Sequence, residues 1–303
     1  MKIPGLALLR GVLGKRLVIA LPMLWLLLFF LVPFIIVFKI SFSETIIAMP
    51  PVAPMIDWIN GQMQVHLRLA NYARLFGDNL YWMSYAYSVM VAAISTLLCL
   101  LIAYPMAYVI ARAQGSMRNV LFMLVMLPSL TSLLLRVYAW IGLLQNNGVI
   151  NNVLMGLGLI DEPIIMLHTN FATYVGIVYS YLPFMVLPLY SNLEKHDLTL
   201  LEAAADLGAH PFKSFLRITL PLSVPGMVAG SMLVFIPAVG EFVIPTLLGP
   251  TDQLMIGRVL TDEFFANRDW PVASAVAIAM LFLLVAPILV FQRYQAKELE
   301  SKA

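Results

Sequence analysis

The sequence predicts an all-α membrane protein with six transmembrane helices. Of its 303 residues, 61% are hydrophobic and only 11% are charged, and the mean hydropathy is +0.91. These values lie far from the averages of soluble domains. The apolar residues also form continuous runs long enough to cross a bilayer as helices, which takes about 20 residues. Because the runs do not alternate with polar residues, they exclude a membrane β-barrel.

The predicted spans cover residues 17–38, 83–111, 120–144, 171–191, 222–248 and 270–292. The first follows four basic residues, as a secretory signal would, but its length exceeds the ~7–15 residues of a signal-peptide apolar region. We therefore interpret it as a retained helix. A long loop at 39–82 separates it from the other five helices, so residues 1–303 are predicted to form a single transmembrane domain with an appended first helix.

The distribution of Lys and Arg between the predicted loops indicates the orientation. Twelve basic residues lie on the side that holds both termini and residues 192–221, and five lie on the other side. Since cytoplasmic loops carry the excess of Lys and Arg, both termini are predicted to be cytoplasmic and the loop 39–82 to be external.

Small residues point to close helix packing. Gly226 and Gly230 lie one helical turn apart in "GMVAG", which permits two helix backbones to approach each other. The single cysteine, Cys99, lies within the second span, where we expect a packing role.

The loop at 199–221 contains residues that commonly start and end helices, and their order predicts two short helices. Thr199 and Glu202 have the spacing of a capping box, and Gly208 suits the left-handed residue that ends a helix. Pro211 suits the first position of a second helix, which we expect to end near Arg217. Three consecutive alanines, 203–205, give the first helix a slim face that another protein's groove could accept. A helix pair lying on lipid is the alternative.

This loop resembles the EAA loop of ABC-importer permeases, E-A-A-x3-G-x9-I-x-L-P. The matching residues are Glu202, Ala203, Ala204, Gly208, Ile218, Leu220 and Pro221. The resemblance covers residues 84–292 and implies the five-helix core of a type I importer, which a first helix commonly precedes. It also implies that the loop docks into a cleft of a separate ATPase subunit.

The chain itself contains no G-x4-G-K-[ST] phosphate-binding motif. Any ATP hydrolysis is therefore expected on a partner chain, and we expect no catalytic residue, metal or cofactor on this one. The expected role is transport rather than catalysis, and no nucleic-acid partner is expected.

Charges on the predicted external side suggest a cationic substrate. Nine acidic residues face five basic ones there, and an acidic entrance concentrates cations. Within the spans, Glu241 and Arg136 are costly to bury and are therefore candidates for function. Either they pair, or Arg136 extends outward, or Glu241 meets an ammonium group on the translocation path. Aromatic side chains that could supply cation-π contacts are Tyr138, Trp140, Tyr174 and Tyr181.

Further segments resemble polyamine-import permeases of the putrescine type. They are "LRVYAWIGLLQNNGVIN", "IVYSYLPFMVLPLY", "GSMLVFIPAVGEFVIPTLLGP" and "EFFANRDWPVASAVAI". This resemblance implies a bacterial inner-membrane subunit that forms a heterodimer with a homologous permease. Its other partners would be two ATPase subunits and a periplasmic polyamine-binding protein.

Three alternatives remain open from the residues. A type I importer of sulfate, ferric ion or thiamine would share the EAA loop. A cation-coupled secondary transporter would use Glu241 as its own ion site and need no ATPase. A structural membrane scaffold would poorly explain the complete EAA pattern.

Overall fold

The computed structural model describes residues 18–59, 62–65 and 67–301. The chain divides into two compact units. One combines the residues up to Asp78 with Asp262–Ala279, and the other combines Asn79–Thr261 with the chain from Met280 onward. In the described residues both are helical apart from one short hairpin, which confirms the predicted all-α class. Among the described residues, five helices are long and apolar enough to cross a membrane, or six if one bent pair counts as a single span.

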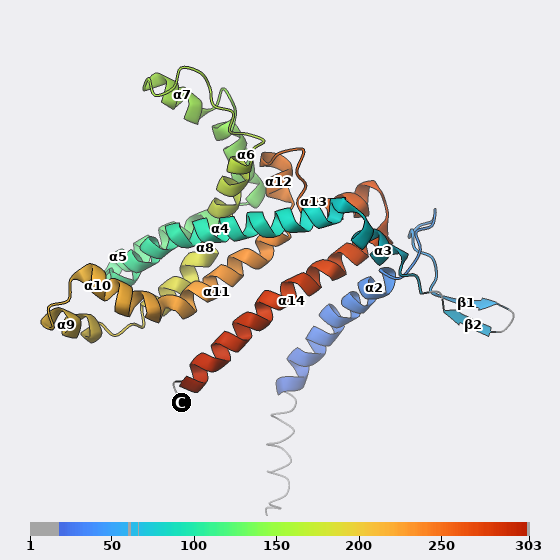
Figure 1. Ribbon diagram of the computed structural model, residues 1–303, viewed down its shortest axis with the longest axis horizontal. Helices are drawn as coiled ribbons and strands as arrows, with labels where there is room; N and C mark the ends of the chain where they lie inside the picture. Colours follow the sequence, from blue (N-terminus) through green and yellow to red (C-terminus); the bar gives the residue numbers. More distant parts are fainter. Residues whose placement is uncertain (1–17, 60–61, 66, 302–303) are drawn as a thin grey trace, which may run out of the picture. The chain divides into compact units, whose positions relative to one another are not determined.

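Three long helices form the centre of the second unit: α4 (Asn79–Arg112), α8 (Asn170–Leu193) and α11 (Leu220–Val239). They pack side by side (Figure 1). Cys99 is fully buried among them. A Cβ added to Gly226 would lie 2.7 Å from Cβ of Asn192, and one added to Gly230 would lie 2.7 Å from Sδ of Met185. The predicted close packing at these two glycines is thereby confirmed.

The third predicted span, 120–144, is interrupted. The structure has α5 (Gly115–Met126), a 3-10 turn (Leu127–Leu130) and α6 (Leu133–Leu144), followed by α7 (Val149–Gly156). The direction of the chain changes by 91° at this break. Pro128 has no N–H to donate to the preceding helical turn. At the end of the 3-10 turn, the Thr131 hydroxyl donates to the Pro128 carbonyl at 2.8 Å.

The fifth predicted span, 222–248, also differs. Its helix begins earlier, at α10 (Pro211–Ser214), and runs through a π-helical turn (Phe215–Thr219) into α11. It ends at Val239, and the shorter helices α12 (Val243–Leu248) and α13 (Ile256–Thr261) follow. Pro237 and Gly240 lie at this end, where proline and glycine both weaken helix continuation.

The first unit begins with a helix at Val18–Ile40, which includes a π-helical turn (Leu27–Leu31) and α2 (Val32–Ile40). Strands β1 (Ile56–Ile59) and β2 (Gln62–Val65) then pair antiparallel within the predicted loop 39–82. They are followed by α3 (Ala70–Gly77). A π-helical turn (Asp262–Ala266) and the start of α14 (Trp270–Ser301) complete this unit.

Candidate coupling loop and substrate-path residues

The EAA motif occupies a short, exposed helix, α9 (Thr199–Asp206), at one end of the second unit (Figure 1). Its end has the two bonds of a Schellman motif, with Gly208 N donating to Ala205 O at 2.8 Å and Ala209 N to Ala204 O at 2.9 Å. Gly208 has a φ of +77°, as predicted for the residue that ends this helix. Pro211 then opens α10. The predicted helix, glycine turn and second helix are therefore present.

The predicted capping box is wrong. Leu198, not Thr199, occupies the N-cap position, and no side chain caps the helix from there. Instead, a carboxylate oxygen of Asp197 accepts a hydrogen bond from the Thr199 amide at 3.0 Å. This bond lowers the pKa of Asp197, because it favours the ionised carboxylate. Asp197 therefore accepts the hydrogen bond from the Thr199 amide that the predicted capping box assigned to Glu202.

The second helix was predicted to end near Arg217, and this is also wrong, because it continues into α11. In the π-helical turn the Leu220 N–H donates to the Phe215 carbonyl, five residues earlier. This wider turn places Pro221 in the first turn of α11, where proline is tolerated. The motif residues Ile218 and Leu220 are half-buried there, and Pro221 is exposed.

The base of the loop is firmly attached to the rest of the second unit. The Phe215 ring packs edge-on against the rings of Tyr104 and Tyr108 in α4, with centroids 5.8 and 6.1 Å apart. The Tyr104 hydroxyl and the Ser223 hydroxyl form a hydrogen bond of 2.9 Å. Arg118 in α5 pairs with Glu194 at 2.5 Å. These contacts attach the base of the loop to the helices of the core.

His196 adds another contact at this base. One of its ring nitrogens, Nε2, lies 3.2 Å from the Leu222 carbonyl oxygen. Burial lowers the pKa of His196, because the charged imidazolium loses hydration there.

The tip of the loop, in contrast, is exposed. No residue of α9 is buried, and Glu202 and Ala203 are exposed. Leu207 is 89% exposed and Phe212 is 65% exposed. A helix that exposes large apolar side chains beside a row of alanines is suited to docking against another protein.

Glu241 lies at the break between α11 and α12 and is only 7% exposed. Its Oε1 accepts hydrogen bonds from three backbone amides, those of Phe242 at 3.2 Å, Val243 at 3.0 Å and Ile244 at 3.4 Å. Its Oε2 accepts one from the Tyr181 hydroxyl at 2.6 Å. The carboxylate therefore stabilises the start of α12, where the free amides and the helix dipole favour a negative charge.

Arg136, in α6, makes no ion pair with Glu241. Its Nε and Nη1 atoms are buried and have no hydrogen-bond partner within the described part of the chain. The expected pairing is therefore not seen. Arg136 as a whole is half-buried.

Three of the four aromatic candidates surround one apolar cluster. Tyr174 and Tyr181, both on α8, and Trp140, on α6, pack against it. Trp140 also packs edge-on against Tyr179, with ring centroids 5.5 Å apart. Tyr138 is 59% exposed. Of the predicted path residues, the structure joins only Tyr181 and Glu241 by a hydrogen bond.

Residues 99–300 match the family described as "Binding-protein-dependent transport system inner membrane component". The chain belongs to this family. It is 37% identical over 292 residues to the spermidine/putrescine transport system permease protein PotB of Haemophilus influenzae, an alignment that covers 95% of this chain and 96% of that protein. It is 42% identical to PotB of Escherichia coli strain K12 over 225 residues, which is 74% of this chain and 82% of that one.

A solved structure shares the fold of this permease. A chain of a bacterial ABC transporter that imports the acidic polysaccharide alginate superposes with a TM-score of 0.69, covering 95% of this chain and 99% of that one, at 17% identity. The type I permease fold predicted from the sequence is thereby confirmed. The family match includes both α9 and Glu241.

Sequence reasoning missed how this permease holds Glu241. Pro237 and Gly240 precede the acid and are compatible with a helix break there, but they do not identify its partner. The hydrogen bond between Tyr181 and Glu241 joins residues 60 positions apart. Such a pairing depends on how α8 and α11 pack, which no local pattern reports.

Proposed function

We propose that this permease is the membrane-spanning subunit of an ATP-driven importer of polyamines such as putrescine and spermidine. The carrying observation is the similarity to two PotB proteins, which extends along 95% of the chain in one case. Both are named as subunits of spermidine/putrescine transport systems. The exposed α9, firmly attached at its base, supports a role in coupling to a second protein.

The partners proposed for this permease are a homologous permease, two cytoplasmic ATPase subunits and a periplasmic polyamine-binding protein in the bacterial inner membrane. α9 would dock into the ATPase, with Glu202, Ala203, Ala204 and Gly208 at the contact. Both termini would be cytoplasmic, since the basic residues are concentrated on that side. ATP hydrolysis would take place on the partner.

We also propose Glu241 as an acid that meets the substrate's ammonium group. Its two oxygens have different partners, because Oε1 accepts from three amides at the start of α12 while Oε2 accepts only from the Tyr181 hydroxyl. An ammonium group could replace the phenol at Oε2 and leave the helix cap in place. The Tyr181 ring would remain beside the cation, where a cation-π contact becomes available.

Uptake of radiolabelled putrescine by cells that lack this gene, with and without a plasmid-borne copy, tests the function. We expect uptake to require the gene, to stop when ATP is depleted, and to continue when an uncoupler removes the ion gradient. Uptake that stops with the uncoupler while ATP persists would indicate a secondary transporter. Equal putrescine uptake by cells with and without the gene would contradict the proposed substrate.

A further inference from the structure

Two tyrosines lie at the first turns of α8, at the end of the second unit that is predicted to be external. The Tyr87 hydroxyl, in α4, donates to Oδ1 of Asn170, the first residue of α8, at 2.6 Å. Tyr174 lies one helical turn further along α8. Both tyrosines are half-buried and pack against the same apolar cluster. Two aromatic side chains from neighbouring helices therefore meet this end of α8.

The loop between α12 and α13 crosses from α8 to α4 at the same place. At its start, a Cβ added to Gly249 would lie 2.7 Å from the hydroxyl oxygen of Thr173 in α8. At its end, the Ile256 amide donates to the hydroxyl of Ser88 in α4 at 2.7 Å. Each of these two helix contacts is made by a residue that is next in sequence to one of the two tyrosines. The loop therefore passes beside both of them.

Asp252 lies in the middle of this loop. It is exposed, and no ion pair involving it occurs among the described residues. Because a chain extends by at most about 3.6 Å per residue, the Asp252 backbone lies within about 11 Å of Gly249 and about 14 Å of Ile256. A carboxylate without an ion-pair partner is thus held near two tyrosine rings. Ammonium groups bind to this combination through charge attraction and cation-π contact.

The helix α8 connects this place with Glu241. Tyr174 and Tyr181 are seven residues apart, so they lie on one face of α8, about 10.5 Å apart along its axis. The Tyr181 hydroxyl donates to Glu241 at 2.6 Å. One face of α8 therefore carries a tyrosine near an acid at each of two positions.

We propose that Asp252, with Tyr87 and Tyr174, forms a second ammonium site on the path to Glu241, and that a polyamine of sufficient length occupies both sites together. The terminal nitrogens of extended spermidine are roughly 11 Å apart and those of putrescine roughly 6 Å, from bond lengths near 1.5 Å. Spermidine therefore spans the two positions on α8, whereas putrescine occupies one at a time. Asp252 thus favours the longer polyamine. This inference rests on the proposed function.

The test uses the complete importer in proteoliposomes with ATP inside and its purified binding protein, saturated with either polyamine, outside. We expect Asp252→Asn to lower the initial rate for spermidine about threefold and that for putrescine much less. Asp252→Glu, which keeps the charge, should transport spermidine nearly as the wild type does. Asp161→Asn is the matched control, because Asp161 is also exposed on the predicted external side but lies outside this loop. It should leave the ratio of the two rates unchanged.

Variants of Tyr174 test the aromatic part of the site. Tyr174→Phe keeps the ring and should keep the wild-type ratio of spermidine to putrescine rates. Tyr174→Leu removes the ring and should lower that ratio as Asp252→Asn does. Thermal unfolding of both variants shows whether they fold, since Tyr174 is half-buried.

A wild-type ratio of spermidine to putrescine rates in both Asp252→Asn and a folded Tyr174→Leu would overturn the second site. So would an equal fall of both rates in Asp252→Asn, or the same change of ratio in Asp161→Asn, because these results would assign the effect to the general attraction of cations. Transport of putrescine alone by the wild type would also overturn it. If the wild type transports neither polyamine, the proposed function fails, and the second site fails with it.

Discussion

Glu241 shows how one side chain can be both a structural and a transport residue. Three amides on Oε1 fix its position at the start of α12, and Tyr181 alone occupies Oε2. These four donors satisfy both oxygens of the buried carboxyl group. The arrangement places the carboxyl group beside an aromatic ring.

The variant Glu241→Gln tests this interpretation. The amide oxygen of Gln can still accept from the backbone amides, so we expect assembly and a stability within about 1 kcal/mol of the wild type. Putrescine uptake should fall at least about tenfold, because the charge that meets the ammonium group is gone. Glu241→Ala, which also removes the cap, should lose a further ~1–2 kcal/mol in thermal unfolding. Unchanged uptake kinetics in Glu241→Gln would remove Glu241 from the path.

His196 provides a test by pH. Burial lowers the pKa of His196 from the ordinary value of 6.5, so the folded protein binds this proton less tightly than the unfolded chain does. Its contribution to stability is therefore complete above pH 6.5 and declines as the pH falls below that value. We expect an NMR titration of the ring to give a midpoint below 6.5. A midpoint at or above 6.5 would show that His196 is not buried against α11.

Among the elements, α9 is exposed, whereas the segments that flank it are held by contacts with α4 and α5. We expect Glu202→Lys to insert and fold normally, since Glu202 is exposed and no residue of α9 is buried. Co-purification of the ATPase and transport-coupled ATP hydrolysis should both fall at least about tenfold, as for a central interface residue. Glu202→Gln, which removes the charge without reversing it, should have an intermediate effect. Full coupling in Glu202→Lys would contradict docking through this helix.

The contact between α8 and α11 depends on Gly226. A methyl group there would lie 2.7 Å from Cβ of Asn192, so we expect Gly226→Ala to lose about 1–3 kcal/mol of stability. Gly142→Ala in α6 is the matched control, because nothing lies within 4 Å of a Cβ added there. It should be neutral or gain up to about 1 kcal/mol. Equal melting temperatures for the two variants would show that the helices do not approach so closely.

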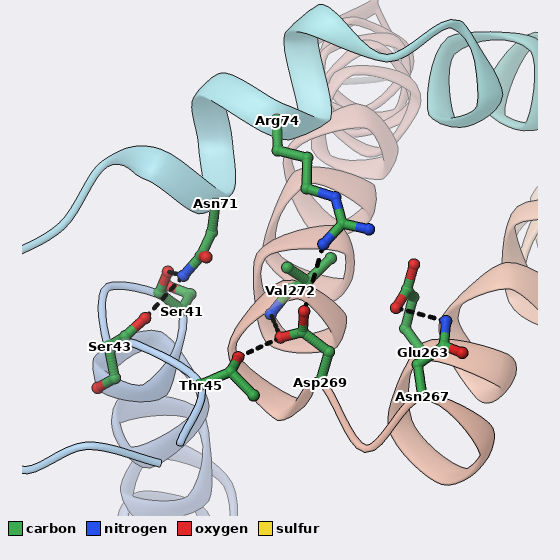
Figure 2. A network of polar contacts seen from close by, with 9 residues as sticks. All are labelled: Ser41, Ser43, Thr45, Asn71, Arg74, Glu263, Asn267, Asp269 and Val272. Atoms are coloured by element: carbon green, nitrogen blue, oxygen red, sulfur yellow. Dashed lines mark hydrogen bonds and ion pairs between the residues drawn. The ribbon is translucent and has the colours of Figure 1, made fainter. Parts of the chain in front are cut away.

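The sequence predicted the elements well where local chemistry decides the outcome. The exposed α9, the left-handed Gly208 and Pro211 at a helix start follow from the conformational limits of these residues. The break in the third span was not predicted, because a membrane proline only kinks a helix when neighbouring groups satisfy the freed carbonyl. The hydrogen bond between Thr45 and Asp269 (Figure 2) was not predicted either, since these residues are 224 positions apart.

In the whole molecule, the two units differ in how far the family match covers them. The second unit contains the coupling loop and Glu241, which both lie within the matching residues 99–300. The first unit contains the hydrogen bond between Thr45 and Asp269, and Thr45 lies before residue 99, where the family match begins. We expect substitutions in α9 to affect coupling to ATP.

The central claim, that this permease imports polyamines by using ATP on a partner chain, is tested most directly with purified components. The complete importer would be reconstituted into proteoliposomes with ATP inside, and putrescine with its binding protein would be added outside, in the absence of any ion gradient. We predict accumulation of radiolabelled putrescine that requires both ATP and the binding protein and is lost in Glu202→Lys. Accumulation that needs an imposed ion gradient and proceeds without ATP would contradict the account.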